Sequence, residues 1–390
     1  MLALSWLIYF SFGLISTTLS TIVTPVMNDL NITYSQMGFT LGAWPLMYIF
    51  IAQPMGLLVD RLGPYKSLLV GATIITVSAV LRSFAINFET LAVFVALFGV
   101  GGSMISVGIP KLTSIWFIGR ERGTASGLYS TGFAMGSMTT LMMTNSILIP
   151  IVGDWRKAYL TYSFIGLLIA VTWAVLGRRS PILSGSKATT KKAKSSLKSL
   201  FKNRNIWIIV LLGITAFLTG LGLSNWLPKI LELKGMTPVE AGVVSSFMNL
   251  IGILGSILLP MLPYVVRSKK LAISILLALE GVGLLALSQA SGLTLWLSIA
   301  IIGLVNRGFM PILMVTLMDM PEVGPERMGA VGGLYFAIGE IGGFGGPFVM
   351  GLLKDITGTF LSGILFLTTV ALASIVFAVL LKVDTPRKQA

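Results

Sequence analysis

The stretch Gly56-Leu-Leu-Val-Asp60-Arg61-Leu-Gly63-Pro-Tyr-Lys66 lies between two long apolar segments. It combines one acidic residue, two basic residues and a glycine–proline pair at the point where the chain has to reverse direction. Glycine and proline are typical of tight turns. The stretch therefore predicts a short charged turn between two apolar helices.

The composition on either side of this turn is that of a membrane protein. Of the 390 residues, 55% are hydrophobic and 11% are charged, with a mean hydropathy of +0.91, whereas a soluble domain is about 25% charged. Apolar runs of about 20 residues recur along the chain, each long enough to cross a hydrocarbon core of about 30 Å. Because these runs lack the two-residue alternation of barrel strands, we expect an all-α membrane protein. The first run has no basic leader and continues past Pro25, which favours a spanning helix over a signal peptide.

Twelve spanning helices are predicted, at residues 4–28, 34–59, 67–87, 90–113, 124–148, 157–177, 206–228, 239–263, 271–289, 293–318, 329–353 and 359–381. An even number places both termini on one side. Of the 28 Lys and Arg residues, 20 fall on the side of the termini and six on the other. Positive residues accumulate in the cytoplasm, so we expect a plasma-membrane protein with both termini cytoplasmic. The net charge of +14 then reflects topology and not a nucleic-acid surface.

The chain divides at one long polar interval, residues 178–205, which carries nine Lys and Arg and no acidic residue. It separates two predicted six-helix bundles, residues 1–177 and 206–390. Within the interval, Leu197, Leu200 and Phe201 share one helical face. This basic loop is interpreted either as an interfacial helix over anionic lipid or as a charged linker.

The two bundles carry matching motifs at an offset near 205 residues. Thr33-x-x-Gln36-x-Gly38 returns as Thr237-x-x-Glu240-x-Gly242, and both segments have the form of a helix-starting capping box. Gly123-x-x-x-Gly127-Leu-Tyr129 returns as Gly329-x-x-x-Gly333-Leu-Tyr335. Two matches at one offset predict pseudo-symmetric bundles of the kind found in many transporters.

The spacing G-x-x-x-D-R-x-G-x-x-K of the first stretch resembles the signature loop of the major facilitator superfamily. The segments Trp116–Gly123 and Gly346–Gly358 are similar to those of its anion and cyanate-permease-like branches. The resemblance implies a monomeric secondary transporter that works by alternating access. Helix 4 lacks an arginine in Val95–Gly102, and the helix 5 glycines are not followed by proline, which disfavours multidrug–proton exchange.

The same resemblance assigns conformational gating to the charged turn. The residues concerned are Gly56, Asp60, Arg61, Gly63 and Lys66, together with Arg120, Glu121 and Arg122 of the loop before helix 5. Asp60 could accept hydrogen bonds from the N-terminus of a neighbouring helix, where a negative charge is favoured. The alternative is a turn whose charges are simply solvated.

Three ionisable residues lie deep in predicted helices: Glu280, Arg307 and Glu340. Each costs roughly 2.5–3.5 kcal/mol at mid-membrane on insertion scales, so each needs a partner or a function. Arg307 and Glu340 share a depth of about 18–20 Å from the inner helix ends. Arg307 is a candidate for binding an anionic substrate group and Glu340 for pairing with it or taking up a proton. The alternative is a structural ion pair.

Further candidates complete the predicted site. Asn225 and Tyr335 are added to the substrate-binding set, and Glu280 is a second proton-coupling candidate, unless it is a protonated structural group. Lys111 either assists an anion or extends to the cytoplasmic interface. The hydroxyl-rich part of helix 1 either contacts substrate or bonds to its own backbone.

The leading hypothesis is transport of a small organic anion, coupled to a proton or to an exchanged anion. The alternative is a facilitator or exporter of a cationic or neutral amphiphile. A receptor or scaffold is disfavoured because no soluble domain is present. An enzyme is disfavoured because the chain has no histidine, no cysteine and no phosphate-binding loop. We expect no cofactor and no nucleic-acid partner; the partners are the lipid bilayer and a small molecule.

Overall fold

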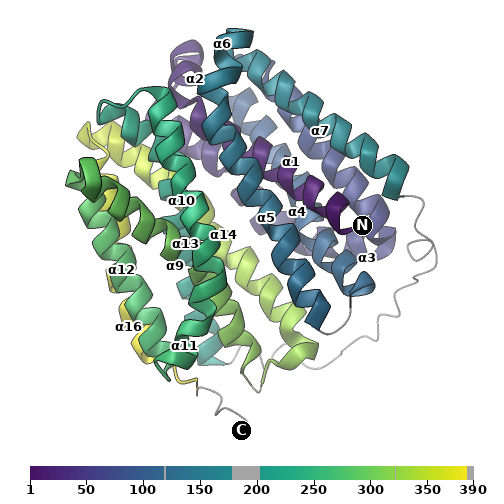
Figure 1. Cartoon of the computed structure of the whole chain (residues 1–390), viewed down its shortest axis with the longest axis vertical. Coiled ribbons are helices and arrows are strands. Elements are labelled where there is room, and N and C mark those ends of the chain that lie inside the picture. Colours follow the sequence, from purple (N-terminus) through teal and green to yellow (C-terminus); the bar gives the residue numbers. More distant parts are fainter. Residues whose placement is uncertain (118–119, 178–202, 321, 384–390) are drawn as a thin grey trace. The chain divides into compact units, whose positions relative to one another are not determined.

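The computed structural model describes residues 1–117, 120–177, 203–320 and 322–383, and helices make up the secondary structure of these ranges (Figure 1). Eleven of the described helices are long and apolar enough to cross a membrane. The helices are α1 (Leu2–Thr21), α2 (Val23–Leu30), α3 (Tyr34–Arg82), α4 (Phe88–Trp116), α5 (Arg120–Met143), η1 (Thr144–Leu148), α6 (Ile149–Val152), α7 (Trp155–Gly177), α9 (Arg204–Leu233), α10 (Pro238–Leu258), η3 (Leu259–Met261), α11 (Leu262–Val265), α12 (Lys269–Gln289), α13 (Gly292–Met318), α14 (Gly324–Thr357), α15 (Leu361–Ala373) and α16 (Ile375–Leu380).

Helix α3 contains two membrane spans. Its 49 residues would extend about 74 Å if straight, more than twice the thickness of a hydrocarbon core. Gly63 interrupts it with φ 77° and ψ 162°, and Pro64 begins the second segment. The Ser67 hydroxyl donates to the Gly63 carbonyl at 2.7 Å and helps to close the first turn of this segment. With α3 counted twice, the described residues contain twelve spanning helices, which confirms the prediction.

Capping boxes begin two helices at equivalent places in the repeat. The Thr33 backbone N–H donates to Gln36 Oε1 at 2.9 Å, and the Gln36 N–H donates to Thr33 Oγ1 at 3.3 Å. Thr237 and Glu240 make the same two bonds, at 2.8 and 3.3 Å. Both predicted capping boxes are confirmed.

Contacts divide the chain into two compact units: Met1–Thr190 with Asn225–Ser246, and Lys191–Ser224 with Phe247–Ala390. The packing-based units therefore differ from the predicted bundles, because the segment 225–246 groups with the N-terminal helices. The proposed interfacial helix of the basic loop lies outside the described residues. The division into two six-helix bundles stays a prediction.

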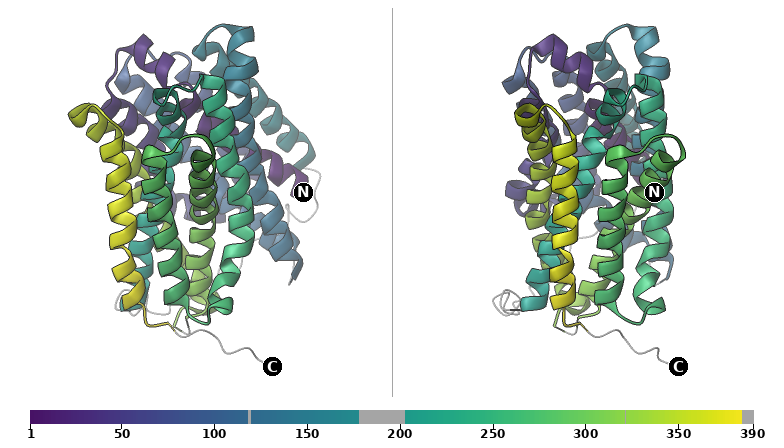
Figure 2. Two further views of the ribbon diagram at one scale, coloured as in Figure 1. Left: turned by 60° about the vertical axis from the view of Figure 1, so that its left-hand side comes forward. Right: turned by 90° about the vertical axis from the view of Figure 1, so that its left-hand side faces the viewer.

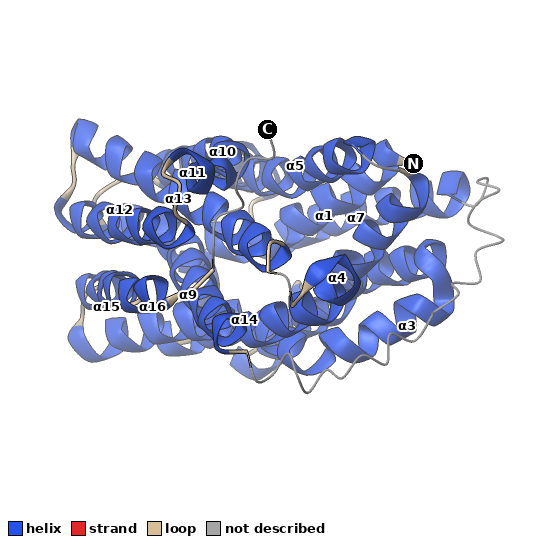
Figure 3. Cartoon of the chain, turned by 90° about the horizontal axis from the view of Figure 1, so that it is seen from below, coloured by secondary structure: helices blue, strands red, loops and turns tan. Residues whose placement is uncertain are grey.

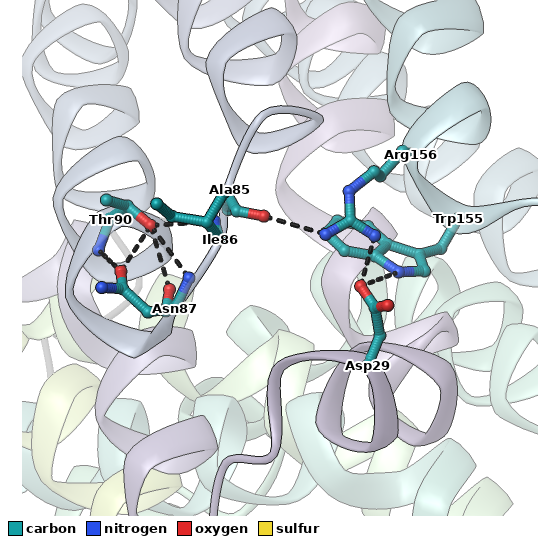
Figure 4. Close-up of polar contacts among 7 residues, drawn as sticks. All are labelled: Asp29, Ala85, Ile86, Asn87, Thr90, Trp155 and Arg156. Atoms are coloured by element: carbon teal, nitrogen blue, oxygen red, sulfur yellow. Dashed lines mark hydrogen bonds and ion pairs between the residues drawn. The ribbon is translucent and has the colours of Figure 1, made fainter.

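In the first unit, α1 packs against α5 and α7, and α3 packs against α4 and α7. One end of this unit is held by Arg156 at the start of α7 (Figure 4). Its Nη2 donates to the Ala85 carbonyl at 3.0 Å, and its Nη1 donates to the Asp29 carboxylate at the end of α2. Asp29 also accepts from Trp155 Nε1 at 3.2 Å. These bonds connect α2, α7 and the α3–α4 turn.

In the second unit, α12 is covered by α13 on one side and by α15 and α16 on another (Figures 2 and 3). Its core is formed by apolar side chains of α9, α12 and α13, with Tyr335 of α14. The start of α12 is tied to the end of α13 by an ion pair, because Lys269 Nζ lies 2.8 Å from Asp319 Oδ2. Lys269 is buried, with an exposed fraction of 1%.

The backbone of Gly63 provides a stability prediction. Its φ and ψ lie in a region that only glycine adopts readily, so Gly63→Ala should lower the free energy of unfolding by about 1–3 kcal/mol. Gly56→Ala is the matched control, since Gly56 is helical and a Cβ there meets nothing within 4 Å. Thermal unfolding of both purified variants checks this. Equal melting temperatures of Gly63→Ala and Gly56→Ala would contradict the backbone conformation assigned to Gly63.

Candidate functional site

Arg307, on the membrane-spanning helix α13, is held by helix α10. Its Nη2 donates to Asn249 Oδ1 at 2.8 Å, and Asn249 is buried. One turn along α10, a Cβ added to Gly252 would lie 2.4 Å from Arg307 Cγ, so the arginine stem passes directly over this glycine. A neutral amide and a glycine therefore fix the direction of a guanidinium that keeps its positive charge.

Glu340 and Tyr335, both on α14, are buried in the second unit, with exposed fractions of 3% and 0%. Glu340 Oε2 and the Tyr335 hydroxyl have no hydrogen-bond partner. The Tyr335 ring packs against Phe217 of α9 at a centroid distance of 6.1 Å. Tyr335 thus serves as core packing in this structure, and a substrate contact for it stays a prediction.

The predicted ion pair between Arg307 and Glu340 is not among the ion pairs of the described residues. The ion pair found in the described part of the second unit joins Lys269 and Asp319 instead. The shared depth of Arg307 and Glu340 is therefore not accompanied by a direct contact. Their roles in binding and coupling stay predictions.

Glu280, near the middle of α12, is buried, with an exposed fraction of 1%. Thr219 of α9 and Asn306 of α13 lie beside its carboxyl group, and Oε2 has no hydrogen-bond partner. Its surroundings are polar but uncharged. Sequence reasoning placed Glu280 on a peripheral helix, yet its carboxyl group faces the interior of the second unit.

Asp60 in the charged turn pairs with Lys111 of α4, since Lys111 Nζ lies 2.6 Å from Asp60 Oδ1. The same ammonium group donates to the Val59 carbonyl at 3.4 Å. In this structure the partner of Asp60 is therefore a lysine and not a helix N-terminus. The turn is also fixed to the end of α7, because Trp173 Nε1 donates to the Tyr65 carbonyl at 3.0 Å.

The other predicted gating residues are placed at the surface or in the turn. Gly56 has open space around it, and Gly63 forms the break in α3. Arg61, Lys66 and Glu121 are exposed. The side chains of Arg120 and Arg122 lie outside the described residues.

A polar network that sequence reasoning missed joins α2 to the end of α9 in the first unit. Lys229 Nζ donates to Thr24 Oγ1 at 2.6 Å, Thr24 Oγ1 donates to Glu232 Oε2 at 2.6 Å, and Lys229 lies 3.3 Å from Glu232. All three groups are largely buried. The available signal was the Lys-x-x-Glu spacing at the end of an otherwise apolar helix. Asn225, in the same segment, is also buried.

The hydroxyls of α1 mostly bond to their own helix. Thr18 Oγ1 donates to the Leu14 carbonyl at 2.8 Å, and Thr21 Oγ1 donates to the Thr18 carbonyl at 2.7 Å. Thr17 differs, because its hydroxyl donates to Ser137 of α5 at 2.9 Å. These contacts favour the structural interpretation of the cluster. Within the described ranges, no three acidic side chains gather closely enough to hold a metal ion.

The repeated halves, the spanning helices and the charged turn all match a known family. The sequence model described as the Major Facilitator Superfamily covers residues 5–347. The chain belongs to this superfamily. It is therefore a multi-pass membrane transporter, and the expectation that it is not an enzyme is confirmed by its family.

Curated members of the superfamily align with nearly the whole chain. The "Probable galactarate/D-glucarate transporter GudP" of Bacillus subtilis is 24% identical and aligns with 96% of this chain and 91% of its own. The "Nitrite extrusion protein" of the same organism is 22% identical, with coverages of 93% and 89%.

A solved structure confirms the fold. It is described as a bacterial homolog to the human lysosomal transporter Spinster, in an inward-facing and occupied conformation. The TM-score is 0.74 at 15% sequence identity, with 97% of this chain and 94% of that chain aligned.

The Thr24–Lys229–Glu232 network leads to a prediction on stability. Lys229→Met should cost about 2–3 kcal/mol of unfolding free energy, because it leaves the largely buried carboxylate of Glu232 without its cation. The double variant Lys229→Met/Glu232→Gln should regain part of this loss, because it removes the unpaired charge as well. Thermal unfolding of the two variants tests this, with the exposed Lys157→Met as control. If Lys229→Met/Glu232→Gln is less stable than Lys229→Met alone, the ion pair between Lys229 and Glu232 is contradicted.

Proposed function

We propose that this member of the superfamily transports a small organic anion across the plasma membrane by alternating access. Arg307 binds the anionic group, and the buried carboxyl groups of Glu340 and Glu280 are the candidates for coupling its movement to a proton or to an exchanged anion. The observation that carries the proposal is the geometry of Arg307. Its guanidinium group lies on a membrane-spanning helix and is oriented by a neutral amide.

A charge within the bilayer is costly, and Arg307 lies on a membrane-spanning helix. A guanidinium group there is unfavourable by roughly 2.5–3.5 kcal/mol on insertion scales. Asn249 orients the group without neutralising it, and the planar fork of arginine suits a carboxylate. A carboxylate that binds beside Arg307 therefore gains a strong electrostatic interaction and offsets part of this cost.

The names of two relatives support an anionic substrate. One relative is named for galactarate and D-glucarate, which are dicarboxylates, and the other for nitrite, an inorganic anion. Both align over about nine tenths of the chain. We infer the same charge class here, and not the same compound.

Two sets of polar contacts in the first unit, one near each end of its helices, are suited to gating. Asp60–Lys111 lies at the turn within α3, and Thr24–Lys229–Glu232 joins α2 to the end of α9. We assign the Asp60 turn to the cytoplasmic face, together with both termini, because 20 of the 28 Lys and Arg residues belong to that side. Polar contacts at two opposite ends can open and close in alternation, as alternating access requires. A monomeric state stays a prediction.

Binding by Arg307 is tested with purified protein and three substitutions. Arg307→Gln should abolish thermal stabilisation by D-glucarate or nitrite, and Arg307→Lys should retain only part of it, because an ammonium group cannot form the planar two-point contact. A ligand at ten times its dissociation constant should add roughly 1.4 kcal/mol to the wild type. Lys354→Gln, at the far end of α14, is the control.

The result that would overturn anion binding is equal stabilisation of wild type and Arg307→Gln. Stabilisation by cationic or neutral amphiphiles instead, unaffected by the substitution, would favour the alternative substrate class.

Asp60 provides a separate test of gating. Asp60→Asn removes the ion pair with Lys111 but leaves the fold of the turn, which depends on Gly63. We expect a transport rate in proteoliposomes reduced by roughly tenfold or less, corresponding to about 1.4 kcal/mol, with ligand affinity unchanged. A transport rate equal to wild type would remove Asp60 from the gating mechanism.

A further inference from the structure

We propose that Glu280 is a proton-binding site whose occupancy is coupled to anion binding at Arg307 through helix α13. The inference rests on the proposed function and makes it more specific, because it identifies the coupling ion as a proton and places its site on α12. The site consists of the Glu280 carboxyl group with Thr219 of α9 and Asn306 of α13 beside it.

The Glu280 carboxyl group lies deep within the membrane-spanning part of α12. Glu280 is eleven residues from Lys269 at the start of α12, which corresponds to about 16 Å along the helix. Its side chain has an exposed fraction of 1%. A carboxylate at this depth is unfavourable unless it is paired, and Glu280 is absent from the ion pairs of the described ranges. A bound proton removes this cost.

Among the described elements that pack against α12, few residues carry a charge that could compete with Glu280. The helices α15 and α16, which pack against it, contain no ionisable residue, and α11 contributes only Tyr264. The ionisable residues of α9 lie near its two ends, at Arg204, Lys229 and Glu232. At the end of α13, Asp319 is paired with Lys269. The charged residue of α13 itself is Arg307, directly after Asn306.

Helix α13 connects the two sites mechanically, because it carries both Asn306 and Arg307. Asn306 and Arg307 are consecutive, so they point to different sides of the same helical turn. Asn306 lies beside Glu280 and against Gly220, where an added Cβ would be 2.7 Å from Asn306 Nδ2. Arg307 lies over Gly252 and bonds to Asn249. Any rotation or shift of α13 that moves Arg307 must therefore also change what surrounds the Glu280 carboxyl group.

The sign of the coupling follows from electrostatics. The positive charge of Arg307 favours the ionised form of Glu280, and an anion bound to Arg307 cancels this effect. Anion binding therefore favours protonation of Glu280, with the proton taken from water. Because coupling between two sites is reciprocal, a proton on Glu280 tightens anion binding by the same factor. The pair moves as an anion together with a proton.

The proton site is tested without any ligand, by infrared difference spectroscopy of the purified full-length protein during a pH titration. Wild type should show a protonated carboxyl band from a buried group that Glu280→Gln lacks. Glu340→Gln, which removes a second buried carboxyl group, should retain this band, and so should Glu89→Gln, which removes an exposed one. If Glu280→Gln keeps every protonated carboxyl band of the wild type, Glu280 is not the proton site.

The coupling is tested by thermal stabilisation with D-glucarate and with nitrite at several pH values. In wild type the apparent dissociation constant should fall with decreasing pH, by up to about tenfold per pH unit for one coupled proton. Glu280→Gln should still bind the anion, and its apparent dissociation constant should change by less than about twofold over the same pH range. Asn306→Ala should keep the infrared band but reduce the pH dependence, since it removes the side chain through which α13 contacts the Glu280 carboxyl group.

The outcomes distinguish this inference from the proposed function. If anion binding keeps its pH dependence in Glu280→Gln and loses it in Glu340→Gln, the coupling residue is Glu340. That result overturns the inference about Glu280 and leaves the proposed anion transport in place. If neither D-glucarate nor nitrite stabilises wild type, anion binding by Arg307 and its coupling to Glu280 are both overturned. The infrared titration still decides the proton site in that case.

Discussion

A hydrocarbon environment contains no hydrogen-bond partners, and this constraint determines where every polar group of the molecule can lie. Backbone groups are satisfied within helices, so the described secondary structure is helical. The ion pairs of the described residues lie at or near helix ends, close to water: Asp29–Arg156, Asp60–Lys111, Lys229–Glu232 and Lys269–Asp319. The ionisable groups at mid-helix instead lie next to uncharged polar or aromatic side chains. That difference separates structural charges from candidates for transport.

The local parts of the fold could be predicted from the sequence, because short-range chemistry determines them. Gly63 and Pro64 end one helix and begin another whatever surrounds them. The Thr33 and Thr237 capping boxes need only residues three positions away. Spanning helices follow from the length of apolar runs alone. The result is a correct helix count, even where α3 continues through the turn.

The candidate site was predicted less well, because its contacts join helices far apart in the chain. Sequence gives the depth of a residue in the membrane, and the depth shared by Arg307 and Glu340 follows from simple counting. It does not give the direction in which a helix faces. Arg307 faces Asn249, 58 residues away, and Lys111 reaches Asp60, 51 residues away. Lys229 bonds to Thr24, which precedes it by 205 residues, and no local pattern indicates that partner.

The ion pair between Lys269 and Asp319 has a consequence that depends on helix dipoles. Lys269 is at the first position of α12, where the positive end of the dipole repels a cation, and Asp319 caps the C-terminus of α13, where the negative end repels an anion. Each charge alone would therefore destabilise its own helix end. Held 2.8 Å apart, each cancels the repulsion on the other. The two helix ends are thus mutually dependent: if they separate, both helices begin to fray at that end.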